Sequence, residues 1–243
     1  RWLEAYRNKE VVEGFSAMAA VDENDEWLCE EYMKTDFHVL REKDFKMTIN
    51  GNLAYLMRQG EWSKIETFIG SLNQTSNQLN SSSNQHPVLN VDQWKAFNVS
   101  SLFDIERGNV ASLNEVDDGT VPIVSASGEN EGIAFYGDVD EKYENNITFS
   151  MNGVNTGYTA YHSYKFNANA DCGILLQKFE MNSYVGVFLS TVIGLLRAKY
   201  CYGRKMTKER MEKEYILLPV KHNDAGEIEI DESHAFSALG YIP

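Results

Sequence analysis

Short apolar segments separated by Gly, Asn and Asp dominate the second half of the chain. Five of them read VPIVSAS from Val121, GIAFYG from Gly132, ITFSMNG from Ile147, YTAYHSYKF from Tyr158 and CGILLQ from Cys172. Two similar segments precede them within residues 94–108. Short runs bounded by turn residues are typical of β-strands. The pattern therefore predicts a twisted sheet of mixed, largely antiparallel strands.

The same half of the chain also holds helical patterns. One helix is expected over about residues 181–200 and a second from near Thr207, with Gly203 at the turn between them. After them, the alternation at residues 227–231 predicts an acidic edge strand, and residues 232–239 a short helix that ends at Gly240.

The N-terminal part follows a helical period instead. Phe45, Ile49, Leu53 and Leu56 fall on one helix face, although Asn50-Gly51 is expected to break that helix. Residues 2–6 and 27–32 suggest two further helices. Their aromatic residues are best interpreted as core or interface residues without chemistry.

A polar stretch separates the two parts. Residues 73–85 read NQTSNQLNSSSNQ, a composition that buries too little apolar surface to offset its ordering entropy. We therefore predict a linker over 73–90, a mainly helical N-terminal segment over 1–72, and a separate domain over 91–243. The predicted fold class is α+β, with helices packed on the sheet of the C-terminal domain.

Composition adds one objection to nucleic-acid binding. The chain has 243 residues, 43% of them apolar, which suffices for a core, but its formal net charge is −14. Duplex DNA is a polyanion, so this charge disfavours binding. The segment 197–213 softens the objection, because it holds seven basic residues against two acidic ones.

Catalytic motifs are missing from the sequence. Adenine and cytosine amino-methyltransferases need a Pro-Pro-Tyr/Phe loop, yet no two of the four prolines are adjacent. A phosphate-binding Gly-x-x-x-x-Gly-Lys loop is absent. The nuclease-like Asp-x-Lys spacing occurs at Asp44–Lys46 and Asp140–Lys142, where solvated surface charge is the better interpretation. We expect no catalytic residues.

Metal-binding, disulfide and membrane signals are also missing. The five histidines are scattered, and the three cysteines are widely spaced, so neither a metal site nor a disulfide framework is expected. No apolar run reaches the roughly 18 residues of a membrane span. These features favour a reducing cytoplasm. The chain begins with Arg1, so neither a native N-terminus nor a signal peptide is visible, and both a complete module and a fragment of a longer protein stay open.

Three segments carry a resemblance to a known family. They are WKAFNVSSLFDIERG over 94–108, VPIVSASGENEGIAFYG over 121–137 and YCYGRKMTKERMEKEYILLP over 200–219, with Asn152-Gly153 and residues 169–173 between them. In order and spacing the chain resembles target-recognition domains of restriction-modification specificity subunits. It is most similar to the single-domain modules of type I-like, type IIB and type IIG systems.

The resemblance implies a non-catalytic module that reads duplex DNA with loops from one edge of its sheet. It also implies a DNA methyltransferase or endonuclease subunit as partner, with S-adenosylmethionine and Mg²⁺ on that partner and none here. A type I subunit with two recognition domains would need about twice this length. The chain is therefore expected to read a half-site, alone, as a homodimer, or as part of a larger protein. The N-terminal segment is expected either to dock the module onto its partner or to be the end of a larger catalytic part.

Candidate DNA contacts come from four places in the sequence. The basic strip at residues 197–213 offers phosphate ligands, the loop after Val124 offers groups that can bind base edges, and the segment around Tyr161 offers stacking and hydrogen bonds. Arg107, just before Gly108, offers a contact to phosphate or guanine. The candidates are Arg107, Ser127, Asn130, Tyr161, His162, Arg204, Lys205 and Lys208. For each candidate a purely structural role stays open: a place on a solvated helix face, in a turn around Gly128, on an ordinary sheet surface, or in an ion pair.

Two other functions remain open at this level. The net charge favours an acidic protein-interaction module of a phage-defence or anti-restriction system, with the same fold and no DNA binding. A hydrolase would need clustered carboxylates that the linear sequence does not display.

Overall fold

A computed structural model describes residues 2–12, 16–79, 90–110, 112–222, 225–226 and 228–231. The chain divides into two compact units, Arg1–Thr35 and Asp36–Pro243. The first contains helix α1 (Trp2–Asn8) and a 3-10 turn at Cys29–Tyr32. The helix expected around Trp27 is reduced to this turn, and the Trp27 side chain is 78% exposed.

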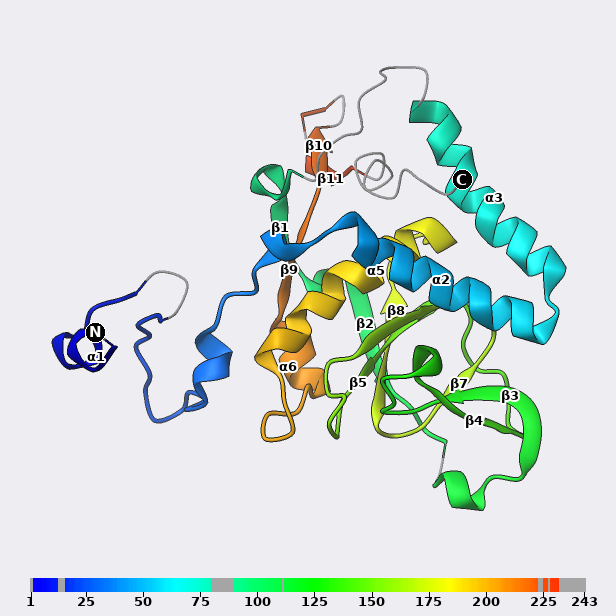
Figure 1. Ribbon diagram of the computed structural model, residues 1–243, viewed down its shortest axis with the longest axis horizontal. Helices are drawn as coiled ribbons and strands as arrows, with labels where there is room; N and C mark the ends of the chain where they lie inside the picture. Colours follow the sequence, from blue (N-terminus) through cyan, green and yellow to red (C-terminus); the bar gives the residue numbers. More distant parts are fainter. Residues whose placement is uncertain are drawn as a thin grey trace. The chain divides into compact units, whose positions relative to one another are not determined.

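A four-stranded antiparallel sheet forms the centre of the second unit (Figure 1). Its order is β2 (Phe103–Arg107), β8 (Cys172–Gln177), β5 (Asn146–Ser150) and β6 (Thr159–His162). The β5 strand is buried along its whole length, as expected for a strand with neighbours on both sides and both faces covered.

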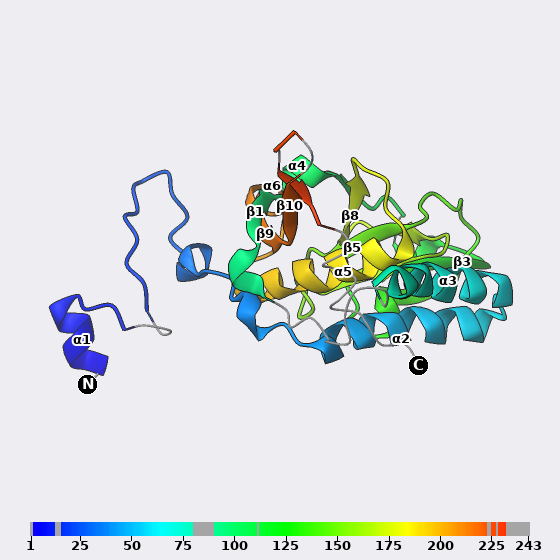
Figure 2. The same ribbon diagram turned by 90° about the horizontal axis from the view of Figure 1, so that it is seen from above.

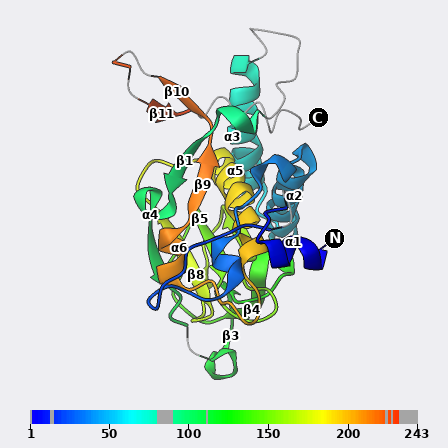
Figure 3. The same cartoon turned by 90° about the vertical axis from the view of Figure 1, so that its left-hand side faces the viewer.

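Smaller sheets surround it. A three-stranded sheet has the order β4 (Ile133–Gly137), β3 (Asp118–Val124) and β7 (Asn167–Ala168), and β7 runs parallel to β3. Strand β1 (Lys95–Asn98) pairs with β9 (Tyr215–Leu218). The β10 (Val220–His222) and β11 (Ile228–Ile230) strands form a separate hairpin (Figure 3). The predicted mixed, largely antiparallel α+β fold is confirmed, and β11 lies in the predicted acidic strand.

Helix α5 (Ser183–Gly194) lies between the main sheet and the N-terminal helices (Figure 2). Almost every one of its side chains is buried, because it contacts β5 and β6 on one side and α2 (Glu42–Gln59) and α3 (Trp62–Leu79) on the other. A helix that is apolar all round needs such cover. The predicted helix over 181–200 continues as a 3-10 segment, η6 (Leu195–Lys199).

The α2–α3 pair differs from the sequence-based expectation. Helix α2 runs without a break through Asn50-Gly51 and ends at Gly60, whose left-handed conformation (φ 69°) lets its N–H bond to the carbonyls of Leu56 and Met57. Helix α3 continues to Leu79, so the first residues of the predicted linker are helical. Residues 80–89 of the linker and the predicted helix at 232–239 lie outside the described residues.

Short helices complete the second unit. Helix α4 (Val99–Leu102) separates β1 from β2, and α6 (Lys208–Lys213) lies next to both α4 and β2. The α6 helix begins where predicted, because the Thr207 hydroxyl accepts a hydrogen bond from the Arg210 N–H and so caps its first turn.

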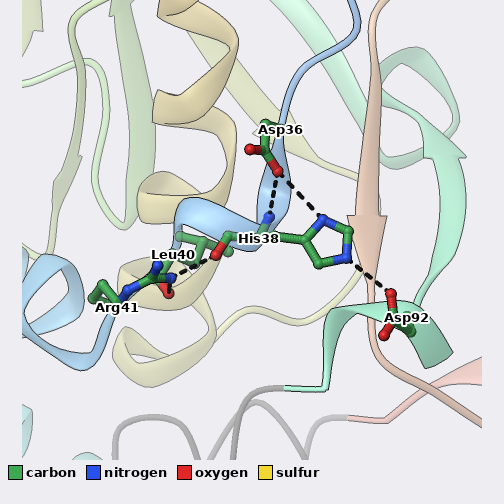
Figure 4. Close-up of polar contacts among 5 residues, drawn as sticks. All are labelled: Asp36, His38, Leu40, Arg41 and Asp92. Carbon is green, nitrogen blue, oxygen red and sulfur yellow. Dashed lines mark hydrogen bonds and ion pairs between the residues drawn. The ribbon is translucent and has the colours of Figure 1, made fainter. Parts of the chain in front are cut away.

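A histidine joins the chain before α2 to the chain before β1 (Figure 4). The His38 ring nitrogen Nε2 lies 2.8 Å from Asp92 Oδ1, and Nδ1 lies 3.3 Å from Asp36 Oδ1. Arg41 donates to the carbonyls of His38 and Leu40. Hydrogen bonding to Asp92 is the main cause that raises the pKa of His38 above its ordinary value.

Candidate nucleic-acid interface

The strand register brings several loops to one edge of the main sheet. Arg107 at the end of β2 pairs with Gly173 near the start of β8, and Ser150 at the end of β5 pairs with Cys172. The chain segments that follow β2 and β5 therefore meet the segment that precedes β8. We call residues 107–108, 125–132, 151–158 and 169–171 together the loop edge.

Side-chain amides hold these loops against one another. Asn169 Nδ2 donates to Ser125 Oγ over 2.8 Å, and Asn155 Nδ2 donates to the Ala126 carbonyl over 3.3 Å. Asn152 Nδ2 lies 3.3 Å from Asp171 Oδ1. The loop after β3 is thus joined to the main sheet, although β3 belongs to the smaller one.

Close backbone approach explains two glycines of the loop edge. A Cβ on Gly108 would lie 2.0 Å from the Asn169 carbonyl oxygen, so no larger residue fits there. Gly157 has a left-handed φ of 82°, and a Cβ on it would lie 2.9 Å from Arg197 Cα. Segment η6 therefore packs on the loop, with the Arg197 side chain exposed.

Arg107, Ser127 and Asn130 lie on the loop edge, as three of the predicted contacts. Arg107 is exposed, and its Nε donates to the Ala170 carbonyl. Ser127 is half-buried and Asn130 is exposed. The DNA contacts predicted for these residues stay predictions.

Lys208 begins α6, which contacts β2, and Lys205 lies three residues before it. Both are exposed, and Lys208 forms a weak pair with Glu212 at 3.7 Å. Hydrogen bonds from Lys142 and Tyr143 are the main cause that lowers the pKa of Glu106, and the charge of Lys208 contributes. Because Glu106 precedes Arg107 on β2, the N-terminus of α6 lies close to the end of that strand. DNA contact by the two lysines also stays a prediction.

Arg204 requires a correction, because it is fully buried. Its guanidinium donates to the Lys199 carbonyl over 3.0 Å and lies over the Tyr200 ring, 4.4 Å from the centroid. Below it, Glu214 binds both Lys199 Nζ at 2.8 Å and the Tyr200 hydroxyl at 2.6 Å. A buried cation needs such partners. Arg204 therefore stabilises the turn that carries Lys205, and phosphate contact is the wrong role for it.

Tyr161 and His162 also require a correction, because neither side chain has exposed surface. The Tyr161 hydroxyl donates to Asn145 Oδ1 over 2.6 Å and lies 3.1 Å from Ser183 Oγ. The His162 ring binds Thr148 Oγ1 through Nε2 at 2.8 Å and approaches the Tyr164 hydroxyl through Nδ1 at 3.0 Å. Burial lowers the pKa of His162 to about 3, so the ring is neutral. Both residues belong to the core, and base contact is the wrong role for them.

The two Asp-x-Lys segments have structural roles. The Asp44 carboxylate accepts a hydrogen bond from the Arg41 N–H and so satisfies a backbone donor at the start of α2. Lys142 pairs with Glu106 at 3.1 Å, while Glu141 pairs with Lys165 at 2.9 Å. Among the described residues, no group of three or more His, Cys, Asp or Glu side chains is arranged to hold a metal ion.

Sequence reasoning missed two basic residues that contact the loop edge. The sequence identifies Arg197 only as one of the basic residues of 197–213, and it gives no sign that Arg58, next to a predicted helix, contacts a loop. Arg58 donates to Asn130 Oδ1 from α2. Nothing in the sequence pattern signals this contact, which joins residues 72 positions apart.

Comparison with known protein families identifies the family of this chain. Residues 91–230 match the family model described as the type I restriction modification DNA specificity domain. That range is more than half of the chain, and the chain belongs to this family. The predicted resemblance is confirmed.

Two curated relatives are also specificity subunits. The type II restriction enzyme specificity subunit S.BcgI of Heyndrickxia coagulans is 29% identical over 147 residues, 58% of this chain and 42% of that protein. A putative type I specificity subunit N-terminus of Mycoplasma pneumoniae is 31% identical over 111 residues, 44% of this chain and 58% of that protein. The chain thus spans about half the length of these relatives.

Solved structures give similar matches. The S subunit of a type I restriction-modification system from M. genitalium matches 81% of this chain and 50% of that chain, with a TM-score of 0.47 and 13% identity. An HsdS subunit from Thermoanaerobacter tengcongensis matches 81% of this chain and 49% of that chain, with a TM-score of 0.42 and 11% identity.

None of the described helices is long and apolar enough to cross a membrane.

Proposed function

We propose that this chain reads duplex DNA as the specificity module of a restriction-modification system and directs a partner methyltransferase or endonuclease subunit to its target. The observation that carries the proposal is the loop edge, where polar side chains from four separate loops lie together in a member of the specificity-domain family. Side-chain amides and hydroxyls are the groups that bind base edges.

Exposed cations next to the loop edge support the same proposal. Arg107, Arg197, Lys205 and Lys208 are exposed and come from β2, η6, the turn after η6 and α6. Phosphate contacts by such residues position a protein on DNA, whereas base contacts give the specificity. A few local cations can thus act in a chain of net charge −14.

The chemistry belongs to the partner in this proposal. S-adenosylmethionine and Mg²⁺ bind the methyltransferase or endonuclease subunit, and this chain is non-catalytic. A single recognition domain reads one half of a target, so a complete site needs a second module or a second copy of the chain.

The test is salt-dependent binding of the full chain to random-sequence duplex DNA, with and without the partner methyltransferase subunit, measured by fluorescence anisotropy. The variant Lys205→Ala/Lys208→Ala removes two exposed cations without touching the buried network around Arg204. Each lost phosphate contact should reduce the slope of log K against log salt by about 0.9, so a reduction of about 2 is expected.

A matched control removes two lysines elsewhere. Lys43 in α2 is exposed, and Lys64 in α3 pairs with Glu61 at 3.5 Å, much as Lys208 pairs with Glu212. Lys43→Ala/Lys64→Ala should leave the salt slope unchanged. An equal loss in both variants would mean that the net charge of the protein, not its loop edge, governs binding. No binding by the wild type with the partner present would refute DNA reading and favour an acidic protein-interaction module.

A further inference from the structure

The loop at residues 125–132 has three successive residues in the left-handed region, and one of them, Glu131, is a residue type that rarely adopts it. Asn130 and Glu131 have φ values of 52° and 54°, and Gly132 follows with 81°. Left-handed conformations of residues other than glycine are uncommon, and two in succession persist only where the surroundings fix them. Something outside the loop must therefore hold it.

Helix α2 provides the first of these contacts. Arg58, in the last turn of α2, donates to Asn130 Oδ1, while Asn130 Nδ2 lies 3.3 Å from the Ile133 carbonyl. The Asn130 amide thus connects the helix on one side with the end of the loop on the other. Both of its polar atoms are used inside the protein.

Helix α2 provides the second contact through Gly51. A Cβ at Gly51 would lie 1.8 Å from Glu131 Oε1, so the glycine leaves room for the Glu131 carboxyl group. Glu131 is half-buried in this position. The glycine in the middle of α2, which weakens a helix, is explained by the approach of this loop.

We propose that α2 fixes the conformation of the 125–132 loop, and that Arg58 is a positioning residue for DNA specificity. The inference rests on the proposed function, because the loop matters for specificity only if the loop edge reads DNA. Residues 42–59 lie outside the range that matches the specificity-domain family, 91–230. Specificity therefore depends in part on a helix that precedes the recognition domain.

The variants separate positioning from charge. Arg58→Ala removes the hydrogen bond to Asn130, whereas Arg58→Lys keeps the charge and a donor. Met57→Ala is the control, because Met57 is the preceding α2 residue and is 57% exposed. Asn130→Ala removes the acceptor for Arg58 and also the bond to the Ile133 carbonyl, so its effect on the loop should be at least as large as that of Arg58→Ala.

The first measurement needs no DNA. Amide hydrogen exchange of the full chain is followed over residues 125–132 and, as an internal reference, over β5. Arg58→Ala and Asn130→Ala should raise exchange in the loop alone, Arg58→Lys should restore most of the protection, and Met57→Ala should change nothing. Unchanged loop exchange in Arg58→Ala would overturn the proposal, whatever the DNA result.

The second measurement uses DNA selected by the wild-type chain from a random duplex pool, together with copies carrying one changed base pair. One mismatch typically costs roughly 5- to 150-fold in affinity. In Arg58→Ala this ratio should fall toward about twofold at the bases read by the loop, with the salt slope retained. A uniform loss of affinity with a slope lower by about 0.9 would make Arg58 a phosphate contact instead.

The two proposals fail separately. If the wild type selects no DNA while loop exchange still responds to Arg58→Ala, the proposed function fails and α2 positions a loop of another role. If the wild type selects DNA and Arg58→Ala keeps both loop protection and the mismatch ratio, only the positioning role fails.

Discussion

A single added methyl group in α5 tests whether Tyr161 is a core residue. Gly186 lies in the first half of α5, and a Cβ there would lie 2.3, 2.5 and 2.7 Å from three carbon atoms of the Tyr161 ring. Non-bonded carbon atoms prefer about 3.5–4.0 Å. In Gly186→Ala the helix and the ring must therefore separate by about 1 Å.

The ring cannot move without a further loss. Tyr161 has no exposed surface, and its hydroxyl binds Asn145 Oδ1 at 2.6 Å and Ser183 Oγ at 3.1 Å. Overpacking of a core typically costs about 1–3 kcal/mol, and a disturbed hydrogen bond adds about 1 kcal/mol. Replacing Gly by Ala in a helix gains about 1 kcal/mol. Gly186→Ala should thus lower the free energy of unfolding by about 1–3 kcal/mol.

Gly194→Ala is the matched control, because Gly194 ends the same helix and its added Cβ would lie 4.0 Å from Thr159 Cβ, an ordinary contact. This variant should be neutral or up to about 1 kcal/mol more stable than the wild type. Urea unfolding followed by circular dichroism gives both values. Gly186→Ala as stable as Gly194→Ala would falsify the packing of Tyr161 against α5 and return Tyr161 to the surface.

Three pH effects are expected from other residues. Folded His162 is neutral, with a pKa of about 3, so the stability that depends on its neutral ring is fully present above pH 6.5 and falls by about 1.4 kcal/mol per pH unit between pH 6.5 and pH 3. His162→Gln should lose this pH dependence when urea midpoints are plotted against pH. Wild-type and variant midpoints that change in parallel with pH would contradict the prediction. Burial raises the pKa of Glu131 to about 7, so the folded chain keeps a proton that the unfolded chain loses from pH 4.5. The free energy of unfolding should then fall as pH rises from 4.5 to 7, and Glu131→Gln should remove this pH dependence. A stability difference between variant and wild type that stays constant between pH 4.5 and 7 would contradict the prediction. The contact with Asp92 stabilises protonated His38, a contribution present below pH 6.5 and lost as pH rises through the raised pKa. Nuclear magnetic resonance titration of Asp92→Asn should show the pKa of His38 returning toward its ordinary value, and an unchanged value would exclude Asp92 as the cause.

The sequence predicted the strands between residues 95 and 177 well, because most of them are short apolar runs bounded by turn residues. It failed on Tyr161 and His162 for a physical reason. In an ordinary sheet, adjacent strand residues face opposite sides, and an alternation of polar and aromatic residues usually means that one face of the sheet is exposed to solvent. Here α5 covers Tyr161, while the Phe166 ring, 4.5 Å from that of His162 by centroid, packs on the other side. A linear pattern does not reveal cover from both sides.

Charge patterns failed in a similar way. A run of basic residues does not reveal which side chain is buried. Arg204 is buried because its guanidinium donates to the Lys199 carbonyl and packs on the Tyr200 ring. The polar composition of residues 73–79 likewise favoured a linker, but α3 extends through them. Local helix formation next to an apolar helical face outweighed the composition of the segment.

The burial of α5 has a consequence for any recombinant that replaces the N-terminal part of this chain. A recombination event that joined foreign sequence at residue 91 would keep the family-matched range but discard α2 and α3, which cover one side of α5. Phe188, stacked on Phe45 of α2 with centroids 5.4 Å apart, would then lose that ring and keep only the contact with Trp94 among these two aromatic neighbours. Productive crossovers should therefore fall before Asp36, so that the helical pair is inherited together with the domain it covers.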